Sequence, residues 1–270
     1  MEKAARQAGH VRGTLPLISA VIIARDAAKT LRATLDSLEW MTEVVVYDNG
    51  SRDDSRAIAS AYANVRVADG AFTGFGPTRN AAAALASNDW IFAIDCDESV
   101  SAELRASILS ADLADPHTVY AVERRNYLMG RAVRHSGWGN DWLVRLYNRR
   151  HAAYDNVSVH ESVRPTAGIT VRRLAGFLEH DAVRQLSDFL VKIDRYTELR
   201  RGDSPRMRSV LLITARSLWA AVKTLVLQRG FLDGWRGVVI AWSNASGVFF
   251  KYMKPLADER RAREQKQTRP

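Results

Sequence analysis

Apolar runs alternate with helix-like segments through the first hundred residues of the chain. Runs at residues 17–24, 43–47, 65–67 and 90–94 have the β-branched, apolar composition of buried strands. Helical patterns lie between them, at residues 27–38, 54–63 and 77–86, and Asp26 stands where the N-cap of the first helix is expected. Strands that alternate with helices are typical of a parallel sheet, so the sequence predicts an α/β fold.

Two aspartates follow the apolar run at residues 90–94. Ligands of open α/β sheets bind at the carboxyl ends of the strands, where Asp95 and Asp97 would lie. Carboxylate oxygens suit Mg²⁺ or Mn²⁺, and these ions bridge to phosphates, which favours a nucleotide diphosphate-sugar as ligand. The alternative is a polar turn that caps the next helix.

Asp48 follows the second predicted strand, so its carboxylate is expected at the same edge of the sheet. It could accept hydrogen bonds from a base or a ribose. The Asp48-Asn49-Gly50 sequence is also typical of an ordinary tight turn, and both interpretations remain open.

Residues 1–14 are polar and basic, without the apolar stretch of a signal peptide, and we expect them to be disordered in a cytosolic protein. Cys96 is the single cysteine, which excludes an intramolecular disulfide. We expect its thiol to be buried and inert.

The net charge of +9 is concentrated in the last third of the chain. Residues 182–270 carry 18 Lys and Arg against 8 Asp and Glu, whereas residues 1–181 carry 21 against 22. An anionic membrane and a nucleic acid are both candidate partners for such a basic segment.

Residues 209–227 form a long apolar segment with helical spacing. Ser209, Arg216 and Lys223 recur every seven residues and leave a broad apolar face that includes Trp219. The two cations argue against a bilayer-spanning helix, so we expect a helix that lies in the interface of an anionic membrane. The alternative is that this face packs on the catalytic domain or on a second copy of the chain, which leaves an oligomer open.

Several motifs in a fixed order resemble a known family. They are SAVIIARD at residues 19–26, VVVYDNGSRD at 44–53, GFGPTRN at 74–80, DWIFAIDCDE at 89–98, YLMG at 127–130, GWGNDWLVRLY at 137–147, VHE at 159–161, KIDRYT at 192–197 and GFLDG at 230–234. The chain is similar to the inverting family 2 glycosyltransferases of the GT-A fold. The later motifs resemble the bacterial branch that adds a glucose or heptose to the inner core of lipopolysaccharide.

This resemblance implies a domain organisation. A GT-A domain, with a mixed sheet flanked by helices, is expected over residues 15–181, after a disordered tail over residues 1–14. A helical, basic and apolar membrane-proximal extension is expected over residues 182–257. A disordered basic tail over residues 258–270 would end the chain.

The resemblance also implies roles for individual residues. Asp141 matches the catalytic base, although the proline that commonly precedes it is Asn140 here, and Glu161 is a rival for the base. Asp97 and His160 are expected to bind a divalent cation, Mg²⁺ or Mn²⁺. Residues expected to contact the nucleotide sugar are Asp26, Asp48, Arg79 and Asp95, and candidates for the acceptor pocket are Trp138, Arg145, Glu161 and His180, each of which could instead have a packing role.

The expected function is transfer of a hexose, glucose from UDP-glucose, to a lipid-linked saccharide such as lipopolysaccharide inner core. The protein would act peripherally on the inner face of the cell membrane. Alternatives are ADP-heptose as donor, or a polyprenyl-phosphate, capsule or exopolysaccharide acceptor. A nucleic-acid-binding protein would explain the basic extension but not the paired aspartates, so we expect no nucleic acid as partner.

Overall fold

The computed structural model describes residues 17–155, 162–163, 168–199 and 207–267. Four parallel strands form its first half, and all four match the predicted runs to within two residues. They are β1 (Ile18–Ala24), β2 (Glu43–Asp48), β3 (Val65–Asp69) and β4 (Trp90–Ala93), in the order β3-β2-β1-β4. The predicted α/β fold is confirmed.

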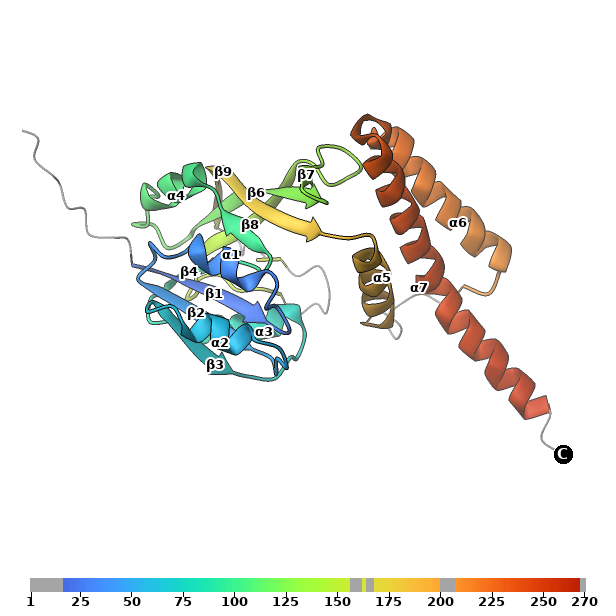
Figure 1. Cartoon of the computed structure of the whole chain (residues 1–270), viewed down its shortest axis with the longest axis horizontal. Helices are drawn as coiled ribbons and strands as arrows, with labels where there is room; N and C mark the ends of the chain where they lie inside the picture. The colour runs from blue at the N-terminus through green and yellow to red at the C-terminus, as the bar shows by residue number, and fades with distance from the viewer. Residues whose placement is uncertain (1–16, 156–161, 164–167, 200–206, 268–270) are drawn as a thin grey trace, which may run out of the picture.

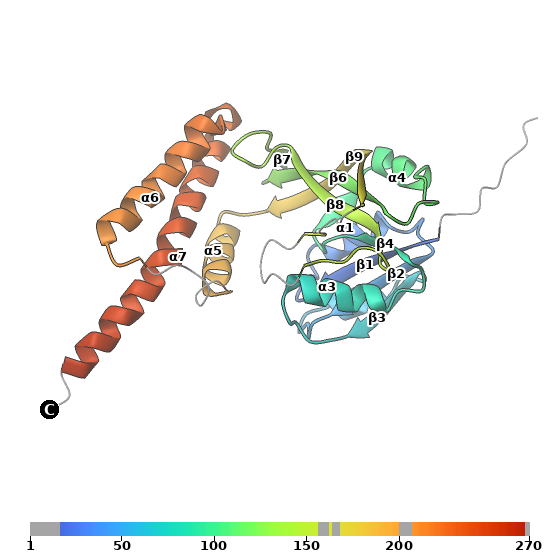
Figure 2. The ribbon, with the colours of Figure 1, turned by 180° about the vertical axis from the view of Figure 1, so that it is seen from behind.

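Helices cover both faces of these strands. On one face, α1 (Leu31–Asp36), α2 (Ser55–Ser60) and α4 (Ala102–Leu109) pack against a core that includes Ile22 and Phe92. On the other face, α3 (Phe75–Ala84) packs with Val21 and Ile91, and the two views in Figures 1 and 2 show α3 on the side away from α1 and α2. Side chains that alternate along a strand point to opposite faces, which explains why β1 contributes to both cores.

The predicted N-cap at Asp26 was wrong. Helix α1 begins four residues later than that cap requires, at Leu31, and no side chain caps it. Asp26 has a φ of 52°, and its Oδ1 accepts a hydrogen bond from the Arg52 amide at 2.8 Å. The carboxylate therefore joins the two loops that follow β1 and β2 instead of capping a helix.

The second half of the sheet is mainly antiparallel. Strand β8 (Asp141–Asn148) pairs antiparallel with β4, and the order continues through β6 (Thr118–Leu128) and β9 (Thr170–Val183) to β5 (Glu98–Val100), while the short β7 (Arg131–Ala132) pairs with β6. Because β8 runs against β4, its first residue, Asp141, lies toward the carboxyl end of β4. The sheet is therefore mixed, as expected for the GT-A fold.

Helices follow the sheet and form the C-terminal part of the molecule. They are α5 (Ser187–Leu199), α6 (Val210–Val222) continued by the π-helical η1 (Lys223–Leu227), the 3-10 helix η2 (Gly230–Asp233), and α7 (Trp235–Gln267). Helices α6 and α7 run side by side as a hairpin (Figures 1 and 2), and Ser217 Oγ donates to the Ala245 carbonyl at 2.7 Å. Helix α7 continues to Gln267, so residues 258–267 are helical where we expected a disordered tail.

The α6–α7 hairpin is attached to the sheet by an apolar contact. Ile240 of α7 packs with Leu128 and Val133, next to the end of β6. Arg236 reinforces this contact, since its Nε donates to the Leu128 carbonyl at 3.0 Å.

The segment Val210–Leu227 is long and apolar enough to cross a membrane by length and composition alone, and only 11% of it is buried.

Candidate active site

The candidate site lies at the edge where β4 ends. Asp95 and Asp97 follow β4 directly, as predicted, and the antiparallel strand β8 brings Asp141 to the same edge. Strand β6 lies next to β8 and contributes Asn126, and β9, on the other side of β6, contributes His180. The site is therefore assembled from residues far apart in the sequence.

Asp95 lies between two arginines. Its Oδ2 is 2.8 Å from Arg145 Nη2, and its Oδ1 accepts a hydrogen bond from Arg79 of α3. Burial would raise the pKa of Asp95, but the two guanidinium groups outweigh it and hold the pKa well below its usual value. Asp95 thus joins α3 to β8 as a carboxylate, and Arg145 is buried beneath this edge, not exposed at an acceptor surface.

A chain of polar side chains links Asp97 to Asp141. His180 Nε2 lies 3.3 Å from Asp97 Oδ2, and His180 Nδ1 lies 2.6 Å from Asn126 Oδ1. The Asn126 amide nitrogen in turn donates to Asp141 Oδ2 at 3.3 Å. Burial would raise the pKa of Asp97, but the hydrogen bond and charge of His180 lower it overall. These contacts hold the Asp97 and Asp141 carboxylates at fixed positions relative to each other.

Asp141 also pairs with Arg124. Its Oδ2 lies 2.8 Å from Arg124 Nε and 2.7 Å from Arg124 Nη2. The side chain remains 26% exposed, so a carboxylate oxygen can meet a substrate hydroxyl. The role of Asp141 as a general base stays a prediction, which requires a substrate hydroxyl within hydrogen-bond reach of this carboxylate.

Glu98 is a site residue to which the sequence analysis assigned no role. Its side chain is fully buried and accepts from Arg145 Nη2 at 2.7 Å and from the Asp95 amide at 3.0 Å. Burial raises the pKa of Glu98 in spite of the nearby arginines. Arg124 and Asn126 were missed too, because they lie in a run of four consecutive polar residues, 123–126, in which no alternation marks one face of β6.

The loops after β1 and β2 hold two other predicted nucleotide contacts. Asp48 is buried, and its carboxylate accepts from the Ser51 amide at 3.2 Å and from Arg56 Nη1 at 3.0 Å. The bond from the Ser51 amide is that of the tight turn considered as the alternative, whereas Arg56 reaches Asp48 from α2. Asp26 lies next to this turn through its bond to Arg52.

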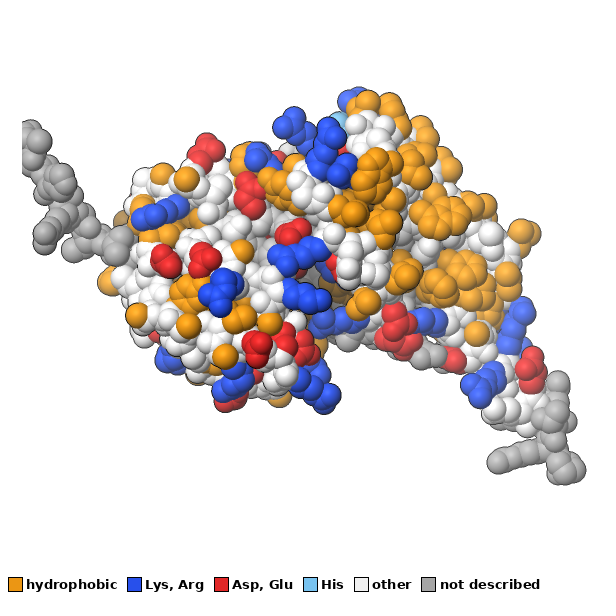
Figure 3. All heavy atoms as spheres, in the orientation of Figure 1, with side chains coloured by type: hydrophobic (Ala, Val, Ile, Leu, Met, Phe, Trp, Pro, Cys, Tyr) orange, Lys and Arg blue, Asp and Glu red, His pale blue; other side chains and the backbone are white. Residues whose placement is uncertain are grey.

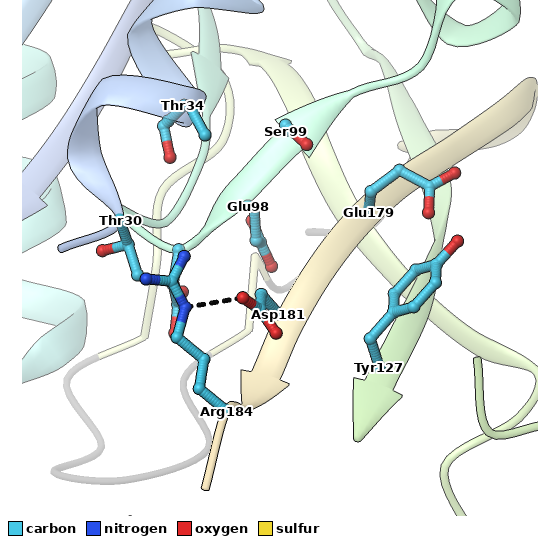
Figure 4. Close-up of a pocket in the computed structure, with 10 residues that line it drawn as sticks. Thr30, Thr34, Glu98, Ser99, Tyr127, Glu179, Asp181 and Arg184 are labelled. Carbon is cyan, nitrogen blue, oxygen red and sulfur yellow. Dashed lines mark hydrogen bonds and ion pairs between the residues drawn. The ribbon is translucent and has the colours of Figure 1, made fainter. Parts of the chain in front are cut away.

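A pocket of about 180 Å³ opens beside Asp97. Figure 4 shows side chains from the α1 region, β5, β6 and β9 around it, with an ion pair between Arg184 and Asp181 at 2.6 Å. Its lining residues are Thr30, Ala33, Thr34, Asp97, Glu98, Ser99, Tyr127, Glu179, Asp181 and Arg184. Of the predicted site residues that the structure describes, this pocket contacts Asp97 alone.

The remaining predicted residues are Trp138, His160 and Glu161. Trp138 is half-buried, its ring lies 6.2 Å from that of Phe189, and its carbonyl accepts from Asn126 Nδ2 at 2.9 Å. His160 and Glu161 lie outside the described residues.

Residues 19–174 match the family model described as "Glycosyl transferase family 2". The chain belongs to this family. It is 26% identical over 259 residues to the lipopolysaccharide core biosynthesis glycosyltransferase LpsC of Rhizobium meliloti (strain 1021), with 88% of this chain and 93% of that protein covered. It is 24% identical to an uncharacterized glycosyltransferase of Rickettsia prowazekii (strain Madrid E), with 88% and 86% covered.

Two solved structures are similar to this family 2 glycosyltransferase. S. aureus TarS 1-349 in complex with UDP matches with a TM-score of 0.46 and 14% identity, covering 91% of both chains. The Mycobacterium tuberculosis glucosyl-3-phosphoglycerate synthase, in complex with Mn²⁺, UDP and glucosyl-3-phosphoglycerate, matches with a TM-score of 0.35 and 22% identity, covering 41% of this chain and 44% of that one. At these TM-scores neither match bears on the site.

The donor atoms around Asp97 can be compared with what a divalent cation requires. Within the described parts of the chain, no three His, Cys, Asp or Glu side chains cluster as a metal cage. Mg²⁺ bound together with a substrate takes only one or two carboxylates and completes its shell with phosphates and water. The Asp97 carboxylate, which is 29% exposed, fits that mode of binding.

Proposed function

We propose that this glycosyltransferase inverts the anomeric carbon as it transfers a hexose, glucose in the leading case, from a nucleotide sugar to a lipid-linked saccharide. The chain of contacts from Asp97 through His180 and Asn126 to Asp141 supports this proposal. It keeps a carboxylate for the diphosphate end of the donor and a carboxylate for the acceptor hydroxyl at one edge of the sheet. UDP-glucose is the proposed donor, and lipopolysaccharide inner core the proposed acceptor.

Asp141 would act as the base. In the proposed reaction the acceptor oxygen forms a bond to the anomeric carbon while the bond from that carbon to the diphosphate oxygen breaks. The proton of the acceptor hydroxyl goes to Asp141, and the electron pair of the broken bond leaves with the diphosphate. Arg124 would orient the Asp141 carboxylate through its two contacts to Oδ2.

Asp97 would hold a divalent cation, Mg²⁺ or Mn²⁺, together with His160. A bound cation supplies positive charge that stabilises the leaving diphosphate. Asp95, Arg79, Asp48 and Asp26 are proposed to shape the nucleotide side of the site. In particular, the ion pairs of Asp95 would fix the backbone from which Asp97 projects.

The proposed site of action is the inner face of the cell membrane. Large apolar side chains gather over α6 and α7 (Figure 3), among them Leu211, Trp219 and Trp242, which are 81%, 58% and 66% exposed. Aromatic residues next to Arg216 and Lys223 suit the interface of an anionic bilayer. A protein that is bound there would meet a lipid-linked acceptor directly.

The test is donor binding and turnover by purified wild-type protein and the Asp141→Asn variant, with UDP-, GDP- and ADP-sugars in Mg²⁺, Mn²⁺ or EDTA. We expect one nucleotide sugar to bind only with the cation. Asp141→Asn should keep this binding and lose turnover by about 10²-fold or more, because the base is gone.

Asp112→Asn is the matched control, since Asp112 is a 61% exposed carboxylate whose charged partner is Arg172. It should behave as wild type in both assays. Turnover of Asp141→Asn at the wild-type rate would overturn the assignment of the base, and tight donor binding in EDTA would overturn the role of the cation.

A further inference from the structure

The tip of the α6–α7 hairpin touches the loop that leads into the candidate active site. Asp233, the acidic residue of the GFLDG motif, ends η2, and its side chain is only 8% exposed. Its carboxylate accepts hydrogen bonds from the amides of Arg134 at 3.3 Å and His135 at 3.1 Å, and from Ser136 Oγ at 2.8 Å. His135 Nδ1 lies 3.2 Å from the same carboxylate. Hydrogen bonds to a buried charge are among the stronger ones in proteins.

The backbones also approach each other closely at this contact. The Ser136 amide donates to the Gln228 carbonyl at 3.0 Å. Gly137 has a φ of +78°, and a Cβ there would lie 2.9 Å from the Gln228 side chain. A residue with a side chain would be strained by this backbone conformation, and it would also displace the end of the Gln228 side chain. The hairpin tip and the loop fit each other with little free space.

The loop continues from this contact to the polar chain of the site. Two residues after Ser136, the Trp138 carbonyl accepts from Asn126 Nδ2 at 2.9 Å. Asn126 is the residue that contacts both His180 and Asp141. A displacement of the loop would therefore move the Trp138 carbonyl, which is a hydrogen-bond partner of Asn126. The Asn126 side chain would shift with it, and the orientation of Asp141 would change.

We propose that Asp233 is a positioning residue that joins the α6–α7 hairpin to residues 134–138 and thereby orients Asn126 and Asp141 for the acceptor. The proposal rests on the proposed function in its final step, because it takes Asp141 as the base. It assigns a role to the GFLDG motif, which is about 90 residues from Asp141 in the sequence. The surface proposed to bind the bilayer and the acceptor side of the site would then be mechanically connected.

The first measurement is amide hydrogen exchange of full-length wild-type protein and Asp233→Asn. Asparagine keeps one acceptor oxygen but places an amide group where the second oxygen accepts, so the hydrogen bonds that this second oxygen accepts from residues 134–136 are lost. We expect exchange in this segment to become about tenfold faster while β1–β4 exchange as in wild type. Asp194→Asn is the matched control, because Asp194 pairs with Lys254 between α5 and α7 and does not contact the loop.

The second measurement is transfer from the donor that binds in the panel above to a membrane lipid extract of cells lacking the protein. Asp233→Asn should lower kcat by about tenfold without changing the KM for the donor. Ser136→Ala, which removes a single bond to Asp233, should give a smaller change in the same direction and serves if Asp233→Asn does not fold.

Unchanged exchange at residues 134–136 would overturn the proposal, as would faster exchange throughout β1–β4, which would mark a general loss of stability. Unchanged kcat with faster loop exchange would also overturn it, because the loop would then not orient the base. The exchange measurement needs no substrate. Absence of transfer by the wild type would count against the proposed function and leave the test of the Asp233 contact intact.

Discussion

Asp95 and Glu98 lie three residues apart and share Arg145, yet their pKa values shift in opposite directions. Asp95 contacts Arg79 in addition to Arg145, and these two guanidinium groups outweigh the effect of burial, so it stays ionised. Glu98 is fully enclosed, and burial dominates its pKa. Arg145 contacts both carboxylates at once. A lysine, whose charge is concentrated at a single ammonium group, could not make both contacts in the same geometry.

Replacement of Asp95 by Asn should lower the free energy of unfolding by about 3 kcal/mol at pH 7, because it removes the carboxylate that pairs with the buried Arg79 and Arg145. The folded pKa of Asp95 lies well below its ordinary value of 3.8. The contribution of the Asp95 carboxylate to the free energy of unfolding is therefore fully present above pH 3.8 and is lost as the pH falls through the folded pKa.

Urea unfolding of wild type and Asp95→Asn at pH 7 and at successively lower pH values below 3.8 would measure this. We expect the difference between the two proteins to shrink toward low pH. A difference that stays constant down the series would show that Asp95 stabilises the fold by some means other than its charge.

At the scale of elements, the strands of the parallel half could be predicted because β1, β2 and β4 are compact, mostly apolar runs and β3 has two valines at alternate positions. The pairing of β6, β8 and β9 could not, since it depends on contacts between segments that are far apart and on the bulges within those strands. Asp95 and Asp97 were correctly placed at a strand end. His180 lies 83 residues from Asp97, and no local pattern indicates that the two meet.

The α6–α7 hairpin offers an element-scale prediction at Gly237, in the first turn of α7. A Cβ there would lie 1.7 Å from the Gly230 carbonyl oxygen, so Gly237→Ala must displace backbone. We expect a loss of about 1–3 kcal/mol in the free energy of unfolding.

Gly247→Ala is the control in the same helix, because a Cβ at Gly247 meets no atom within 4 Å. Alanine is the better helix former, so this variant should be as stable as wild type or more stable, by up to about 1 kcal/mol. Thermal unfolding of both variants compares them directly, and equal behaviour would mean that the contact at Gly237 relaxes without cost.

At the scale of the whole molecule, charge and apolar surface are distributed unevenly. The excess positive charge belongs to residues 182–270, and the same part of the chain exposes Leu227, Phe231 and Trp235 in addition to Trp219 and Trp242. Exposed apolar patches of this kind mark interaction surfaces. The catalytic part of the chain is nearly neutral, so any attraction to an anionic surface would orient the molecule with its helices toward that surface.

Substitution of Trp219 and Trp242 by Ser should weaken binding to vesicles of phosphatidylglycerol and phosphatidylethanolamine by about tenfold for each tryptophan. Donor turnover without vesicles should stay unchanged. Flotation with the vesicles measures the binding, and Leu85→Ser, which alters a 40% exposed leucine after α3, is the control. If the variant with both tryptophans replaced bound the vesicles as tightly as wild type, the apolar surface of α6 and α7 would have to serve a partner other than the membrane.

The reversal of direction between β4 and β8 has a consequence for the order in which the enzyme becomes competent during its synthesis. A ribosome that has released β4 has produced the parallel strands and the two aspartates, but Asp141 and His180 are still to come. Strand β9 must then pair beside β6 before His180 can reach Asp97. A nascent chain at that stage therefore lacks Asp141 and His180, and the candidate site is assembled only when the antiparallel half of the sheet has been added.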